Sequence, residues 1–270
     1  MAFDIILSQG RIADRTSGAI PGAALTAAMV GELIPATVTT VGTPSPAKED
    51  DWSESLPQAH DTLTAISNAV ANSLRQNRIP VLLANTCSAS LASLPVAARE
   101  RPDSVVLWID AHGDFNTPAT TGSGYLGGMV VAAACGLWDS GSGSGLRPEQ
   151  VIIVGGRDID DEEAALLQKA GVRVIPPSEV TPEAIMKATG DAPVWIHVDW
   201  DALEPGFVPA AYKVQDGLLP EQLRALFAAL PREKIAGIEL AEFEASDDDQ
   251  ANAAALGILK EIVTPLFTKG

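Results

Sequence analysis

The sequence predicts an α/β protein built on a doubly wound, mostly parallel sheet of eight strands. Three observations support this prediction: short apolar runs rich in β-branched residues recur along the chain, helical stretches separate them, and polar residues gather where the runs end. The runs are continuous rather than alternating, as expected for strands that helices cover on both faces. The chain has 270 residues, of which 46% are hydrophobic, so we expect residues 1–270 to form a single domain.

The strands and helices alternate along the chain, which favours parallel pairing through crossover connections. The predicted strands are 3–8, 36–42, 80–85, 104–110, 151–156, 172–176, 193–199 and 235–240. The clearest helices between and after them are 56–77, 160–171, 218–230 and about 248–266. The helix at 160–171 begins with acidic residues and ends at a glycine, as a capped helix does. Segments 43–55 and 138–150 are predicted loops, the second a flexible Gly-Ser connector rather than a phosphate-binding loop.

Composition excludes several classes of protein. The formal net charge is −17, so the chain repels phosphate backbones and we expect no nucleic-acid partner. No apolar stretch is long enough to cross a membrane, and the first residues make a poor signal peptide. Two cysteines, Cys87 and Cys135, do not form a disulfide framework. These features predict a cytoplasmic protein.

Polar side chains cluster after the fourth predicted strand and at the end of the seventh. Asp110, His112 and Asp114 follow the fourth strand at alternate positions, and the seventh carries another such series, made up of His197, Asp199 and Asp201. Residues two apart in an extended segment point to one face, and parallel strands bring their carboxyl ends to one edge of the sheet. Carboxylates so close together repel one another unless cations neutralise them. An oxygen-rich set with few imidazoles suits manganese or magnesium, whereas surface charge or helix capping is the alternative interpretation of each cluster alone.

The segments "DAHGDFNTPATTGSG" (110–124) and "DWDALEP" (199–205) resemble the two signature blocks of the arginase and agmatinase (ureohydrolase) family. The order of strands and helices is similar to that family along nearly the whole chain. The resemblance implies a three-layer αβα sandwich of the arginase-deacetylase type, with a site for two manganese ions. It also implies hydrolysis of a guanidino group in a small molecule.

The resemblance assigns expected roles residue by residue. Asp110 and Asp199 match the carboxylates that bridge the two ions, and His112 and Asp201 match the remaining ligands of one ion. Asp114 matches a ligand of the other ion, and it is the expected proton carrier.

Four further positions match residues of the family that bind substrate. Glu242 corresponds to the glutamate that holds the guanidinium group. Asn116 and Ser123 match residues that bind the α-carboxylate of an amino acid, and Asp160 matches the residue that binds its α-amino group. These matches favour an arginine-shaped substrate over agmatine, which has no carboxylate.

The chain departs from the family pattern at Cys87, at Gly127 and at "PAAYKV" (209–214), which replaces a Thr-Gly-Thr segment. Cys87 stands where the family has its first histidine ligand, so one of the two manganese sites should be weakened, because thiolate is a soft ligand. The alternative is that Cys87 is only a small buried residue. Gly127 stands where arginases have a histidine thought to assist proton transfer. His197 replaces a residue that is usually serine, and it either orients a carboxylate, which we favour, or supplies the missing imidazole.

A site without these two histidines should hydrolyse an ordinary guanidinium poorly, because that cation is protonated and delocalised. The N–O bond of Nω-hydroxy-L-arginine lowers basicity and makes the carbon easier to attack. We therefore expect this substrate to give hydroxyurea and L-ornithine, as in a branch of the family that serves antibiotic biosynthesis. The alternatives are a ureohydrolase acting on L-arginine or another guanidino acid, a catalytically weak metal-binding paralogue, and a fold-related deacetylase. The sequence leaves the oligomeric state open.

Overall fold

A parallel sheet forms the centre of the computed structural model, which describes residues 2–268. Within these residues the sheet has eight strands in the order β2-β1-β3-β8-β7-β4-β5-β6, and every neighbouring pair is parallel. The strands are β1 (Phe3–Ser8), β2 (Val38–Val41), β3 (Ile79–Leu83), β4 (Val105–Ile109), β5 (Val151–Val154), β6 (Arg173–Ile175), β7 (Val194–Asp199) and β8 (Ile235–Ala241).

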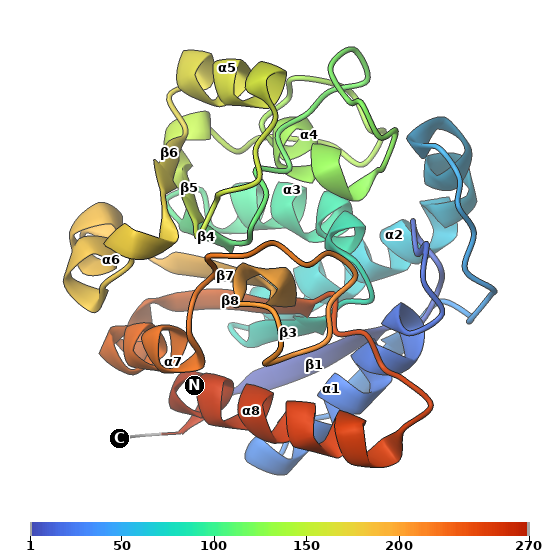
Figure 1. The fold of residues 1–270 in the computed structure, drawn as a ribbon, viewed down its shortest axis with the longest axis vertical. Coiled ribbons are helices and arrows are strands. Elements are labelled where there is room, and N and C mark those ends of the chain that lie inside the picture. Colours follow the sequence, from blue (N-terminus) through green and yellow to red (C-terminus); the bar gives the residue numbers. More distant parts are fainter. Residues whose placement is uncertain (1, 269–270) are drawn as a thin grey trace.

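Helices cover both faces of the sheet, so the fold is the predicted three-layer αβα sandwich (Figure 1). One face packs against α1 (Ala19–Leu33), α6 (Pro182–Thr189), α7 (Pro220–Ala229) and α8 (Asp249–Phe267). The other packs against α2 (Trp52–Arg75), α3 (Ser90–Glu100), α4 (Val130–Ala134) and α5 (Asp161–Ala170). Two apolar cores result, and they explain why β3, β4 and β5 are apolar at every position.

Local signals fix several helix ends. Gly171 terminates α5 in the left-handed conformation, with φ of 78°, as the predicted glycine stop requires. The predicted loop at 43–55 is too long, because α2 begins at Trp52. There the side chain of Asp51 accepts a hydrogen bond from the backbone amide of Ser53 and caps the helix.

The sequence analysis assigned no helix at α1, α3, α4 or α6. Helix α1 is rich in alanine and lacks a polar stripe, so its sequence has little helical periodicity. Helix α3 contains Pro95, and α4 has only five residues. Among residues 2–268, no helix combines the length and apolarity that crossing a membrane requires.

The sheet order places four strand ends together. Strands β3, β8, β7 and β4 lie side by side at the centre of the sheet, and parallel pairing brings their carboxyl ends to the same edge. Cys87 follows β3, Glu242 follows β8, Asp199 ends β7 and Asp110 follows β4. Segments far apart in the chain thus meet at one edge, where α/β sheets bind their ligands.

Candidate active site

A pocket opens at the carboxyl edge of the sheet. It is lined by Cys87, His112, Asp114, Asn116, Ser123, Tyr125, Gly127, Gly128, Asp158, Asp160, Glu163, Asp199, Tyr212 and Glu242. Most of the residues selected from the sequence are in this lining. Asp110 and Asp201 lie beside the pocket, where both contact His112. His197 is completely buried and is not part of the lining.

Asp110, His112 and Asp201 form one group of potential metal ligands, with donor atoms all within 4.8 Å of one another. Nδ1 of His112 lies 3.2 Å from Oδ1 of Asp110 and 3.1 Å from Oδ2 of Asp201. The backbone amide of His112 donates to Oδ1 of Asp110, and that of Ala111 donates to Oδ1 of Asp201. These bonds orient both carboxylates toward the imidazole.

Cys87 joins the carboxylates from the β3 side of the site. Its Sγ lies 3.2 Å from Oδ2 of Asp199 and 3.3 Å from Nε2 of His197. Cys87 forms one potential ligand group with Asp199 and Glu242, and another with Asp110 and His197. Asp114 belongs to none of the three groups, although it lines the same pocket.

Two acidic residues of the site have an uncommon backbone conformation. Asp114 has φ of 49° and Glu242 has φ of 63°, in the left-handed region that side chains disfavour. Such conformations persist where the surroundings impose them, and they cluster at functional sites. The backbone amide of Cys87 donates to Oε1 of Glu242 over 2.9 Å, which fixes this carboxylate beside the segment that follows β3.

The electrostatics of the site fit bound cations. Burial raises the pKa of Asp114, Asp199 and Glu242 well above their ordinary values, and repulsion from neighbouring carboxylates adds to the shift. Within the described chain, the buried Oδ2 of Asp201 makes no hydrogen bond, although His112 Nδ1 is near. Divalent cations would stabilise this arrangement, because they neutralise the charge and supply partners for the free oxygens. The residues present therefore suit a metal centre.

The residues predicted to bind the amino-acid end of a substrate also lie in the pocket. Asn116 is 7% exposed, and its Oδ1 is buried without a hydrogen-bond partner in residues 2–268. Ser123 and Asp160 are exposed and line the same pocket. The structure thus brings the three together, with two of them at the solvent side.

Tyr125 is a site residue that the sequence analysis missed. Its hydroxyl donates to Oε1 of Glu242 over 3.3 Å. A Cβ atom built on Gly127 would lie only 2.4 Å from Cε1 of Tyr125, so the phenol ring occupies the space that a side chain at 127 would need. The guanidinium of Arg15 lies over this ring, 4.8 Å from its centroid. The aromatic residue between Ser123 and Gly127 was the available signal.

Glu163 and Arg157 also support the site, although the sequence analysis did not predict a role for either. Oε1 of Glu163 accepts a hydrogen bond from the amide of Phe115 over 2.7 Å, and burial raises the pKa of Glu163 to about 7. Arg157, which follows β5, donates to six backbone carbonyls, which belong to Gly155, Asp201, Ala202, Leu203, Val214 and Gln215. It therefore fastens the loop that carries Tyr212 against the sheet.

Fold and site together define a parallel α/β protein with a carboxylate-rich candidate metal centre at its carboxyl edge. The sequence pattern of the arginase family matches residues 23–264. The chain belongs to the arginase family.

Individual relatives agree with this assignment. The chain is 56% identical over 265 residues to the N(omega)-hydroxy-L-arginine amidinohydrolase of Streptomyces lavendulae, covering 98% of this chain and 97% of that protein. It is 32% identical over 165 residues to the arginase of Eremothecium gossypii, covering 54% of this chain and 41% of that one. In three dimensions it resembles the arginase of Bacillus caldovelox, with a TM-score of 0.85, 22% identity and coverage of 100% and 99% of the two chains.

Proposed function

We propose that the protein hydrolyses the guanidino group of Nω-hydroxy-L-arginine, giving hydroxyurea and L-ornithine. The observation that carries the proposal is the 56% identity, along 98% of this chain, to a protein named as an amidinohydrolase of that substrate. The pocket suits an amino acid with a cationic or polar side chain, because buried acidic groups and exposed polar groups both line it.

The proposal assigns the two ends of the substrate to different parts of the pocket. Glu242 accepts hydrogen bonds from the guanidino nitrogens, held in place by the amide of Cys87 and the hydroxyl of Tyr125. Asn116 and Ser123 bind the α-carboxylate, and Asp160 binds the α-ammonium group. Together they hold the guanidino carbon in one position, which favours reaction by proximity.

We further propose two manganese ions, held by Asp110, His112, Asp114, Asp199 and Asp201, with Cys87 beside the more weakly bound ion. When bound, such ions lower the pKa of water toward neutrality and so supply a nucleophile at physiological pH. The protein's own contribution is to hold these carboxylates ready, since backbone amides orient Asp110, Asp199 and Asp201.

Asp114 is the proposed carrier of the proton that the departing ornithine nitrogen needs. Burial and the nearby Asp110 raise the pKa of its carboxyl group, so it can hold a proton and then release it.

The hydroxylated substrate suits this site because it is a weaker base than arginine. Gly127 offers no side chain for proton transfer, and the phenol of Tyr125 fills that space instead. A substrate that is more often neutral and more easily attacked needs less assistance. The resemblance to the hydroxy-arginine hydrolases of the family also suggests a role in the biosynthesis of the antibiotic D-cycloserine. Added hydroxyurea should then restore antibiotic production in a producing strain that lacks this protein.

The test is product analysis with purified protein and manganese. Hydroxyurea and ornithine should appear from Nω-hydroxy-L-arginine in equal amounts, and the Glu242→Gln variant should form them much more slowly. Release of urea from L-arginine at an equal or greater rate would favour the arginase alternative.

A further inference from the structure

We propose that His197, on β7, is itself a metal ligand and binds through Nε2. It supplies the imidazole that is missing after β3, where Cys87 stands. The ion in this position would then be held by a mixed set of sulfur, nitrogen and oxygen donors from Cys87, His197 and Asp110. This inference deepens the proposed function, because it concerns the same metal centre, and it assigns His197 a role different from the carboxylate-orienting one expected from the sequence.

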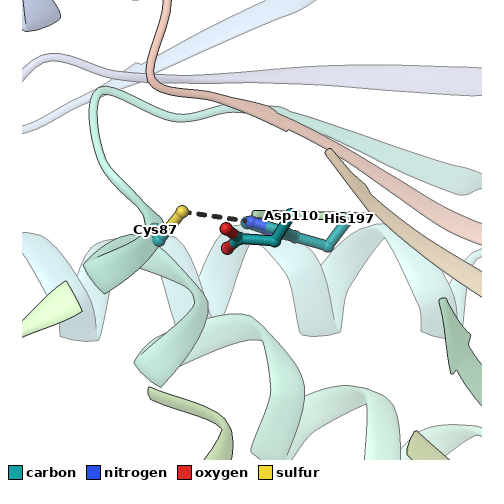
Figure 2. Close-up of side chains that lie close together, drawn as sticks. All are labelled: Cys87, Asp110 and His197. Atoms are coloured by element: carbon teal, nitrogen blue, oxygen red, sulfur yellow. Dashed lines mark hydrogen bonds between the residues drawn. The ribbon is translucent and has the colours of Figure 1, made fainter. Parts of the chain in front are cut away.

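The donor atoms of this set already lie together. Nε2 of His197, Sγ of Cys87 and a carboxylate oxygen of Asp110 are all within 4.8 Å of one another. Figure 2 shows the edge of the imidazole and the Asp110 carboxylate both turned toward the sulfur. The Nε2–Sγ distance is 3.3 Å. Nitrogen and sulfur ligands of tetrahedral zinc, at about 2.0 and about 2.3 Å from the ion, are about 3.5 Å apart, so these two atoms lie at a separation typical of ligands that share one ion.

The other ring nitrogen is bound as it is in ligating histidines. Nδ1 of His197 lies 2.8 Å from Oε2 of Glu239. A histidine that binds metal usually donates its second N–H to a carboxylate, which fixes the ring and leaves the opposite nitrogen free for the ion. In the proposed arrangement Nδ1 donates to Glu239, which leaves the lone pair of Nε2 for the ion beside Cys87.

Several hydrogen-bond donors hold the carboxylate of Glu239 in position. Ser90, Ser93 and Trp195 all donate hydrogen bonds to its carboxylate. Burial alone would raise the pKa of Glu239, but the hydrogen bonds from His197 and the serines outweigh it, and the pKa lies below its ordinary value. A completely buried carboxylate is costly unless it is satisfied in this way. An apolar strand packs without a buried carboxylate, so packing alone does not account for Glu239.

The imidazole plane is fixed by the neighbouring strand. Trp108 and His197 are lateral partners on β4 and β7, and His197 and Glu239 are partners on β7 and β8. The rings of Trp108 and His197 stack with centroids 3.6 Å apart and planes within 3°. Nε1 of Trp108 also donates to Oδ2 of Asp110. One row across the sheet therefore orients two of the three donors.

The experiment observes the metal–nitrogen bond directly. The chain has three histidines, His60, His112 and His197, so protein labelled with ¹⁵N-histidine gives few imidazole signals. It is loaded with ¹¹³Cd, whose one-bond coupling to nitrogen appears only where the two atoms are bonded. We expect coupling at His112 and at Nε2 of His197, and no coupling at the exposed His60. Coupling at His112 alone, or at no histidine, would overturn the inference.

Variants assign the signals and test the role of Glu239. His60→Gln should leave both couplings in place, and His197→Gln should remove one of them. Glu239→Gln should keep the coupling at His197 while weakening cadmium binding about 10–100-fold, as loss of such a carboxylate does. Unchanged affinity in Glu239→Gln would contradict the part assigned to Glu239. The number of coupled imidazoles in the wild-type spectrum already separates one histidine ligand from two.

A failure of the ligand assignment can be distinguished from a failure of the proposed function. Production of hydroxyurea is measured with the manganese protein and does not depend on which histidine binds. A protein that hydrolyses Nω-hydroxy-L-arginine but shows no coupling at His197 would overturn only the ligand assignment.

Discussion

The hydroxyl of Tyr125 lies 3.3 Å from Oε1 of Glu242 and donates a hydrogen bond to it. Burial raises the pKa of Tyr125 well above its ordinary value, and the nearby Glu242 adds to the shift, so the phenol keeps its proton. Tyr125 therefore positions the carboxylate to which we assign the guanidino group.

Removing this hydroxyl should weaken catalysis without unfolding the protein. We expect Tyr125→Phe to lower kcat/KM for Nω-hydroxy-L-arginine about 10-fold, the loss of one hydrogen bond to a charged group. If Tyr125 acts through Glu242, adding Tyr125→Phe to Glu242→Gln should cause little further loss. If the two losses in kcat/KM multiply in the double variant, Tyr125 acts independently of Glu242.

Two adjacent glycines provide a matched test of the space that Tyr125 fills. A methyl group at Gly127 would meet the Tyr125 ring, whereas one at Gly128 would meet nothing within 4 Å. Gly127→Ala should reduce the free energy of unfolding by about 1–3 kcal/mol, as overpacking does, or displace the ring and lower kcat/KM. Gly128→Ala should leave the free energy of unfolding unchanged. Urea unfolding and steady-state kinetics on both variants measure the difference, and equal behaviour of the two would contradict the packing described.

Arg157 should matter through the loop it fastens rather than through charge. Lysine keeps the charge but has a single nitrogen, so it cannot serve six carbonyls in a fixed plane. We expect Arg157→Lys to raise KM and to expose the loop at 203–217 to limited proteolysis. The exposed Arg224→Lys is the control and should change neither property. Resistance to proteolysis equal to that of the wild type would argue against this role.

Metal removal should destabilise the protein, because the buried carboxylates would lose their counter-charge. A ligand present at about 100 times its Kd stabilises a fold by about 2.7 kcal/mol, which corresponds to a Tm shift of about 5 °C or more. We expect chelation to lower Tm by this amount and added manganese to restore it. Dialysis should remove one ion before the other. A Tm insensitive to the chelator would be inconsistent with a metal centre at this site.

The sequence predicted the sheet and the carboxylate cluster because both follow from local patterns. All eight strands were found, since buried parallel strands are apolar at successive positions. Asp110, Asp199 and Asp201 meet because parallel strands end at one edge. Helix α1 was missed because an alanine-rich helix between a sheet and another helix has no polar stripe to mark its period.

What the sequence could not predict depends on lateral contacts. The pairing of His197 with Glu239 depends on the register of β7 against β8, which neither segment specifies alone. A signal was available, because His197 and Glu239 each interrupt the apolar run of a predicted strand. The occupation of the space beside Gly127 by Tyr125 likewise required coordinates, since two residues that are close in sequence can point either way.

The most direct test of the proposed function is the ratio of kcat/KM for Nω-hydroxy-L-arginine to that for L-arginine, measured with manganese on the same preparation. The imidazole that is missing at Gly127 should cost arginine turnover about 10²-fold, the lower end for acid–base assistance. We therefore predict that the hydroxylated substrate is preferred at least about 10²-fold and that hydroxyurea accumulates with ornithine. Equal values for the two substrates, or a preference for L-arginine, would contradict the proposal and identify an ordinary arginase.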